Sequence, residues 1–274
     1  MILGLTQGLS EFLPISSSGH LLLVPWLFGW QDFAGPGGKD LEKAFDVALH
    51  IGTSAAVLVY FRKDLAGLAR AGLRSARRRA VETREERLFW LLVLSAVPGV
   101  ITGALLDGFI TEHLGAEWLI GLMLAVFGGV LLLADRRPAE RPEGEFARRD
   151  ALLMGVAQAV ALQPGVSRSG VTMSMARWRR FDRNATARLS FLMSIPITGG
   201  AVTYKVGKLF LLDGGIPEGF GGAFAVGILT SGISGFAAVA LLLKLLRTRT
   251  FTPFVVYRVA AGVAVVALAA STLR

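Results

Sequence analysis

Residues 164 to 172 have the sequence PGVSRSGVT and lie between two long apolar stretches of a very hydrophobic chain. Small residues, several hydroxyls and one arginine are typical of a loop that binds phosphate. Proline and glycine at its start interrupt any helix that runs into it. The stretch therefore predicts a phosphate site at a break between two helices, in a part of the chain that is apolar enough to lie in a membrane.

Residues 2 to 20 repeat the pattern of this loop. With a shift of 151 positions and no gap, five residues coincide: Gly4 with Gly155, Gln7 with Gln158, Ser16 with Ser167, Ser18 with Ser169, and Gly19 with Gly170. Two copies of one loop predict one composite site, to which each copy contributes different side chains.

The composition indicates an all-α polytopic membrane protein. Of the 274 residues, 53% are hydrophobic and 18% are charged, and the mean hydropathy is +0.56, which is too apolar for a soluble domain of this length. The chain has no cysteine, which excludes disulfides and thiolate metal sites. Glu11 lies within the first apolar stretch and the first basic residue is Lys39, so we expect residues 1 to 29 to be retained rather than removed as a signal peptide.

Six apolar stretches are long enough to cross about 30 Å of hydrocarbon as helices. They lie near residues 44 to 61, 87 to 106, 115 to 134, 186 to 212, 219 to 246 and 254 to 273. Two further stretches, 2 to 29 and 151 to 176, are interrupted by Pro14 and by Pro164. We expect these two to be re-entrant helical hairpins whose bends are buried in protein or line a wet cavity.

The net charge of +9 comes from arginines in short segments beside the apolar spans. Residues 62 to 87 carry nine Lys or Arg, 135 to 150 carry five, 177 to 188 carry five and 247 to 249 carry two. This is the positive-inside pattern and not that of a nucleic-acid-binding protein, so these segments should face the cytoplasm.

With this topology the first hairpin enters the membrane from outside and the second from the cytoplasm. Each hairpin is followed by three spans, so the chain is predicted to be an inverted repeat with halves 1 to 135 and 150 to 274. Folds of this kind place their site near the bilayer midplane, where the broken helices meet.

The first hairpin carries the candidate catalytic groups. Gln7 and Glu11 are four residues apart and share a helix face. A carboxylate within an apolar helix should hold a cation or an arginine, and oxygen ligands favour Mg²⁺ or Ca²⁺, with Gln7 as a neutral second ligand. Ser16, Ser17 and Ser18 form the bend, and one of them should cap the next helix.

His20 follows the serines and is the candidate acid or base near neutral pH. Spacing alone leaves open whether Ser17 attacks phosphorus or orients a water molecule. Asp46 and His50 share a face of the first span, and either a structural pair or a supporting role for the site is compatible with their spacing.

The second hairpin carries the candidate phosphate-binding groups. Arg168 has no carboxylate within ten residues on either side, so its partner must come from elsewhere, and its planar fork suits phosphate oxygens. Ser167, Ser169 and Thr172 add hydroxyls. The structural alternative is an ion pair between Arg168 and Glu11, which would also bring both loops together.

With these residues in view, the chain resembles the bacterial undecaprenyl-diphosphate phosphatases of the bacitracin-resistance type. The resemblance rests on QGLSEFLP at 7 to 14, SSSGH at 16 to 20 and PGVSRSG at 164 to 170. Later spans also match, through SFL at 190 to 192, IP at 195 and 196, PF at 253 and 254, and YR at 257 and 258. Where many members have glutamate, position 7 is glutamine, which leaves Glu11 as the principal anion.

The resemblance implies hydrolysis of a C55 polyprenyl diphosphate to its monophosphate, which recycles the carrier lipid for cell-wall synthesis in the bacterial plasma membrane. It also implies a divalent cation, an active site open to the extracytoplasmic side, and a lipid partner rather than a nucleic acid. The roles carried over give Gln7 and Glu11 to the metal and catalysis, His20 to acid-base chemistry and Ser17 to nucleophilic attack. The resemblance also implies that the phosphates are bound by hydroxyl side chains of both loops and one arginine: Ser16, Ser18, Ser167, Arg168, Ser169 and Thr172.

Two alternatives belong to other classes. Other membrane lipid phosphatases need a second histidine six residues after the arginine, and position 174 is serine. A transporter or flippase of polyprenyl phosphate would share the inverted-repeat architecture. The sequence leaves the oligomeric state open, with a homodimer as one possibility.

Overall fold

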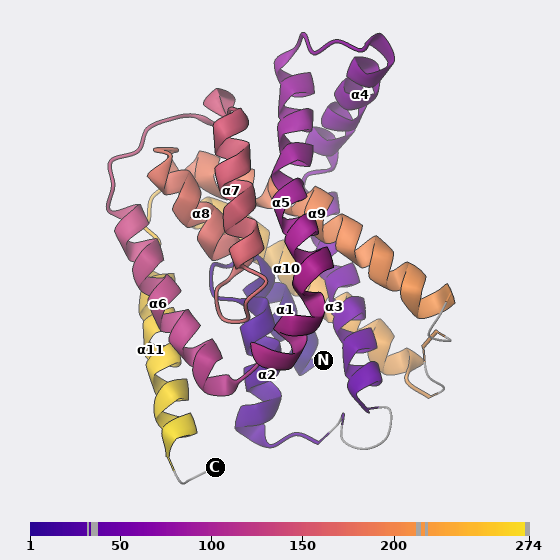
Figure 1. Cartoon of the computed structure of the whole chain (residues 1–274), viewed down its shortest axis with the longest axis vertical. Helices are drawn as coiled ribbons and strands as arrows, with labels where there is room; N and C mark the ends of the chain where they lie inside the picture. The colour runs from indigo at the N-terminus through magenta and orange to yellow at the C-terminus, as the bar shows by residue number, and fades with distance from the viewer. Residues whose placement is uncertain (32, 34–37, 212–214, 217–218, 272–274) are drawn as a thin grey trace.

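A computed structural model describes residues 1–31, 33, 38–211, 215–216 and 219–271 of the chain (Figure 1). Within these residues the secondary structure is helical. The helices are α1 (Ile2–Phe12), α2 (Ser17–Phe28), α3 (Gly38–Tyr60), α4 (Arg62–Arg78), α5 (Arg84–His113), α6 (Glu117–Asp135), the short 3₁₀ helix η1 (Glu143–Glu145), α7 (Arg148–Val160), α8 (Arg168–Trp178), α9 (Arg183–Leu211), α10 (Gly221–Leu245) and α11 (Thr252–Ala270). The predicted all-α architecture is confirmed.

All six predicted spans are helices in the structure, α3, α5, α6, α9, α10 and α11. Four of them, α5, α6, α10 and α11, are long and apolar enough to cross a bilayer by themselves. Helix α3 meets this criterion together with α4, which bends away from it by 83°, and α9 is less apolar because serine, threonine and glycine are spread along it. The chain is therefore a multi-pass membrane protein. Two predicted spans extend beyond the described residues, at position 212 and at positions 272–273.

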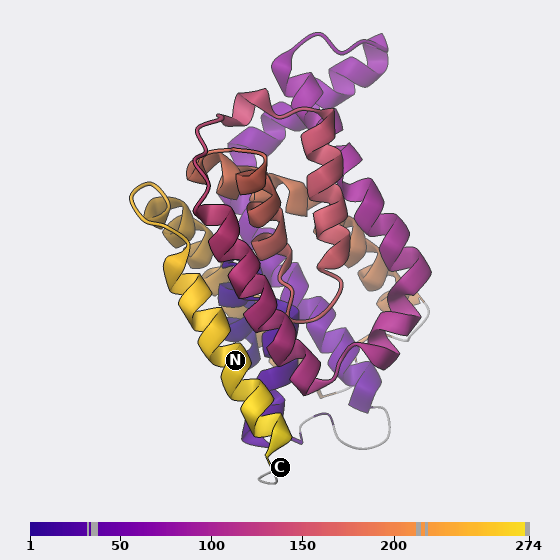
Figure 2. The same cartoon turned by 60° about the vertical axis from the view of Figure 1, so that its left-hand side comes forward.

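Both interrupted stretches form helical hairpins. Helices α1 and α2 are 11 and 12 residues long, and α7 and α8 are 13 and 11 residues long. At 1.5 Å per residue each extends roughly 17 to 20 Å, too short to cross the hydrocarbon alone. The loop between α7 and α8 lies in the middle of the molecule, as the two views show, rather than at either end (Figures 1 and 2).

The hairpins interlock with the other half of the chain. Helix α1 packs against α10, and α7 packs against α5. Glycines permit both contacts, because a Cβ at Gly4 would lie 2.9 Å from the Gly227 carbonyl oxygen and one at Gly155 would lie 2.6 Å from that of Ser95. Gly4 and Gly155 are one of the pairs in the sequence repeat. The halves 1 to 135 and 150 to 274 remain a prediction from the sequence, and they do not pack as separate units.

Candidate active site

The two bends have the same unusual backbone conformation at equivalent positions. Ser16 has φ 79° and Ser167 has φ 74°, in a region that L-residues rarely adopt. Each serine caps the helix that follows: the Ser16 hydroxyl accepts a hydrogen bond from the Gly19 amide at 3.4 Å, and Ser167 accepts one from Gly170 at 3.1 Å. The 151-residue repeat in the sequence thus corresponds to two similar loops.

Direct hydrogen bonds join the two bends. The Gly165 amide donates to the Ser16 hydroxyl at 3.1 Å, and the Ser169 hydroxyl donates to the Leu13 carbonyl at 3.0 Å. Residues about 150 positions apart in the sequence are therefore in contact. The two copies of the repeated loop lie together, as the repeat predicts.

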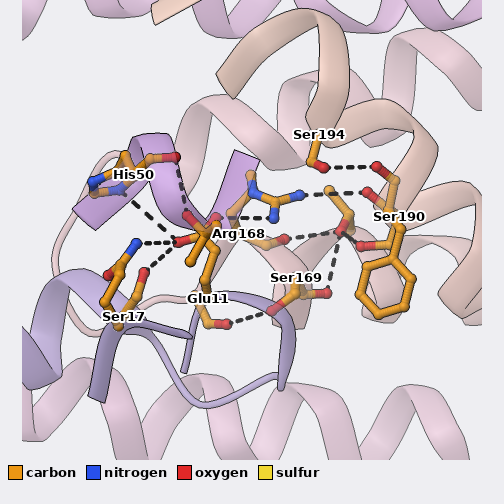
Figure 3. A network of polar contacts seen from close by, with 12 residues as sticks. Glu11, Ser17, His50, Arg168, Ser169, Ser190 and Ser194 are labelled. Atoms are coloured by element: carbon orange, nitrogen blue, oxygen red, sulfur yellow. Dashed lines mark hydrogen bonds and ion pairs between the residues drawn. The ribbon is translucent and has the colours of Figure 1, made fainter. Parts of the chain in front are cut away.

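Glu11 is the centre of the polar network between the bends (Figure 3). Its carboxylate is 8% exposed. One oxygen, Oε1, accepts a hydrogen bond from Arg168 Nη2 at 3.0 Å. The other, Oε2, accepts one from Ser17 Oγ at 2.6 Å and a longer one from Gln7 Nε2 at 3.4 Å. A candidate nucleophile and the candidate phosphate-binding arginine thus flank the same carboxylate.

Arg168 retains a free donor although it is paired with Glu11. Its Nη1 donates to the Ser190 carbonyl at 3.4 Å, and its buried Nε has no hydrogen-bond partner among the described residues. Thr172 shares a 2.6 Å hydrogen bond with the Ser190 hydroxyl, which fixes α8 against α9. An unpaired buried guanidinium donor is costly, so this geometry favours an acceptor such as a phosphate oxygen.

His20 and His50 have different positions relative to Glu11. His20 Nδ1 lies 2.7 Å from the Ser16 carbonyl oxygen, and Nε2 lies 2.6 Å from the Tyr257 hydroxyl, whose ring stacks on the imidazole. Both ring nitrogens of His20 therefore have partners other than Glu11. His50 Nε2 instead lies 4.0 Å from Glu11 Oε2, while its Nδ1 contacts the Asp46 carbonyl oxygen at 2.7 Å.

Arg258 is a residue of the site region to which the sequence assigns no role. It lies on α11 with 0% exposure, and its guanidinium donates to carbonyl oxygens of both bends. The acceptors are Pro14 at 3.0 Å, Gly165 and Val166 at 2.9 Å each, and Leu124 of α6 at 3.2 Å. The signal that could have found it is a charge within an apolar span, which is costly unless it is satisfied by protein.

The carboxylate of Glu11 and the amide oxygen of Gln7 are the kinds of oxygen ligand that fit a divalent cation. Gln7 is fully buried, and its Oε1 has no hydrogen-bond partner among the described residues. The amide nitrogen of the same Gln7 side chain contacts Glu11, so this unpartnered oxygen lies close to the carboxylate. Within the described residues no cluster of three or more acidic, histidine or cysteine side chains is present. One carboxylate and neutral oxygens suit Mg²⁺, which commonly completes its shell with water and phosphate oxygens.

Comparison with known proteins identifies the family. The family model described as "Bacitracin resistance protein BacA" matches residues 1–264. Three proteins named "Undecaprenyl-diphosphatase" are similar to the chain over nearly their whole length. The protein of Desulforudis audaxviator is 44% identical and covers 98% of this chain and 96% of its own, that of Pelotomaculum thermopropionicum is 45% identical (99% and 96%), and that of Geobacter sulfurreducens is 43% identical (97% and 96%). The chain belongs to the bacitracin resistance protein BacA family.

Proposed function

We propose that this protein hydrolyses undecaprenyl diphosphate to undecaprenyl phosphate and inorganic phosphate. The observation that carries the proposal is the arrangement at Glu11, where Ser17 Oγ and Arg168 Nη2 contact the two oxygens of one carboxylate at 2.6 and 3.0 Å. The proposed nucleophile and the proposed phosphate ligand are thus each in hydrogen-bond reach of the proposed base. The names of the relatives support the same activity over transport of a polyprenyl phosphate.

Ser17 is the proposed nucleophile. Its hydroxyl already donates to Glu11, so the carboxylate can accept that proton as Oγ attacks the terminal phosphorus. The bond from this phosphorus to the bridging oxygen breaks, and undecaprenyl phosphate leaves. Water then hydrolyses the phosphoserine and releases inorganic phosphate. Arg168 stabilises the charge on the phosphoryl oxygens through its free Nε donor and neighbouring nitrogens.

Gln7 and Glu11 are the proposed protein ligands of a divalent cation, Mg²⁺ or Ca²⁺. When bound, such a cation would neutralise diphosphate charge and polarise the phosphoryl oxygens. Ser169 and Thr172 keep the arginine-bearing helix in place through the Leu13 carbonyl and the Ser190 hydroxyl. The role of His20 in proton transfer stays a prediction, because Tyr257 and Ser16 hold both its nitrogens.

We also propose that the protein lies in the bacterial plasma membrane with this site open to the extracytoplasmic side. The arginine-rich α4 and the C-terminal end of α11 lie at opposite ends of the molecule (Figure 1), and the positive-inside rule assigns the α4 end to the cytoplasm. Helix α2, which completes the hairpin carrying Glu11, ends on the side away from α4 (Figure 1).

The test is phosphate release from undecaprenyl diphosphate by the purified protein in detergent with Mg²⁺. Arg168→Ala and Glu11→Ala should each lower kcat/KM by roughly a hundredfold or more. Arg70→Ala and Glu82→Ala are matched controls, since both residues are exposed on or beside α4, and should keep parental rates. No release by the parent, or parental release by both site variants, would contradict the proposal.

Acid quenching during turnover of ³²P-labelled substrate tests the nucleophile. If Ser17 attacks, labelled phosphoserine should be recovered at position 17 and should be absent from Ser17→Ala. Turnover at the parental rate by Ser17→Ala would assign the attack to water instead.

A further inference from the structure

A pocket opens directly beside Glu11, between α3 and α9. It encloses about 330 Å³ of empty space, including its open mouth. Helix α1 contributes Glu11 and Phe12 to its wall, and the other lining residues come from α3 and α9. The pocket is thus continuous with the carboxylate at the centre of the candidate active site.

The lining residues form matching stripes on the two long helices. Those of α3 are at positions 53, 54, 57 and 58, and those of α9 are at 194, 195, 198 and 199. Both sets follow the spacing i, i+1, i+4 and i+5, which places each set on one face of its helix over two turns. The two faces therefore line a channel roughly 8 Å long in the direction of the helix axes.

The channel leads from buried polar groups to an apolar surface. Its walls include Thr53, 1% exposed, and Ser194, 2% exposed, whereas Leu58 is 47% exposed. In a multi-pass protein such an exposed leucine contacts lipid chains. Beside the Leu58 end of the pocket, Phe61, which directly follows α3, and Phe191 of α9 are buried with ring centroids 6.2 Å apart, so the two segments pack closely there.

We propose that this pocket binds the first isoprene units of the lipid diphosphate. The phosphates then reach Glu11 and Arg168, while the tail leaves between α3 and α9 into the bilayer. A linear polyisoprenoid chain, whose only branches are methyl groups, suits a narrow channel with small residues in its walls, because it buries its surface without leaving polar groups unpaired. This assignment rests on the proposed function and adds to it the place of the tail.

Gly199 and its neighbour Gly200 offer a matched test. Gly199 lines the pocket and Gly200 does not. A Cβ at either position would have no atom within 4 Å, so a side chain can be added at both without a clash with the fold. Leucine at 199 would occupy the space assigned to the tail, and leucine at 200 would extend elsewhere.

The assay compares undecaprenyl diphosphate with dimethylallyl diphosphate, which carries a single five-carbon unit. Gly199→Leu should raise KM for the long substrate and lower its kcat/KM about tenfold, equivalent to the loss of a few buried methylene contacts. The short substrate should change by less than about twofold. Gly200→Leu should match the parent on both. Leu58→Trp and Val59→Trp form a second pair, since Leu58 lines the pocket and Val59, also exposed, does not.

Parental kcat/KM of Gly199→Leu for the long substrate would overturn the tail assignment while leaving the phosphatase function intact. An equal loss on both substrates would overturn it too, because that result indicates damage at Glu11 rather than exclusion of a tail. No phosphate release by the parent from either substrate would overturn the function and the tail assignment together.

A labelling experiment on the parental protein is independent of variant stability. A prenyl diphosphate analogue with a diazirine in its second isoprene unit should crosslink within residues 53–58 or 194–199. Crosslinks confined to other helices would contradict the proposal.

Discussion

Arg258→Met should destabilise the protein strongly, because Arg258 supports both bends of the site. The guanidinium is fully buried and donates to four carbonyl oxygens at 2.9 to 3.2 Å. Two of these acceptors belong to the bend at 165 and 166 and one to the bend at Pro14. Methionine has a similar apolar stem but no donor, so the four carbonyls would lose their partner.

The magnitude follows from the cost of unsatisfied acceptors. A buried carbonyl without a hydrogen bond costs about 1 to 3 kcal/mol, so four would cost about 4 to 12 kcal/mol if nothing relaxed. Removing the buried charge recovers part of this, because burial of a guanidinium without a carboxylate is itself unfavourable. A net loss of about 3 to 5 kcal/mol is the size seen when buried ionic partners are removed. For a chain of this length it corresponds to a fall in Tm of roughly 6 to 10 °C.

Thermal unfolding in detergent, followed by tryptophan fluorescence, measures this fall. Arg249→Met is the control, since Arg249 is exposed in the turn between α10 and α11, and should change Tm by less than about 2 °C. Arg258→Lys should be intermediate because an ammonium retains the charge but cannot reach all four carbonyls. A Tm for Arg258→Met within 2 °C of the parent would refute the supporting role.

Three further predictions concern the cation, the histidines and the response to acid. Gln7→Ala should raise the Mg²⁺ concentration for half-maximal activity about tenfold, and Gln7→Glu should lower this concentration because a second carboxylate is added. Binding of Mn²⁺, followed by electron paramagnetic resonance, measures the same change in affinity without turnover. His50→Ala and His20→Ala should both lower kcat/KM. The loss should be larger for His50, which lies nearer Glu11. Parental rates for His50→Ala would exclude a role of this histidine at the site. Burial raises the pKa of the Asp150 carboxyl, but hydrogen bonds from arginines including Arg141 hold it below its ordinary value of 3.8. The ionised Asp150 carboxylate therefore stabilises the fold fully above about pH 4, and this stabilisation is lost as pH falls further. The Tm of the parent should fall between pH 4 and pH 2 more steeply than that of Asp150→Asn. Equal slopes for the two proteins would contradict this role of Asp150.

Local features of the sequence predicted the hairpins well. Proline, glycine and serine runs break helices wherever they occur, so the bends after Pro14 and Pro164 are visible without knowledge of the fold. The repeat also carried real conformational information, because Ser16 and Ser167 share a positive φ and the same capping hydrogen bond. A glycine is not required there, and the serine hydroxyl compensates for the strained backbone by capping the helix.

Contacts between distant segments could not be predicted in the same way. His20 has the stronger claim by proximity in the sequence, yet its ring is held by Tyr257 from the last helix, 237 positions away. His50 approaches Glu11 only because α3 packs against α1. Likewise, the four acceptors of Arg258 are carbonyl groups, which every residue possesses and which leave no mark in the sequence.

The ion pair between Glu11 and Arg168 combines the two roles that the sequence left as alternatives. Pairing neutralises both groups in a region where either charge alone would be costly. Two polar atoms beside the pair remain buried without partners among the described residues, Nε of Arg168 and Oε1 of Gln7, the neighbour of Glu11. One is a donor suited to a phosphate oxygen and the other is an acceptor suited to a cation. Under the proposed function, a diphosphate bound together with a divalent cation would satisfy both atoms, and the ion pair between Glu11 and Arg168 would not have to break.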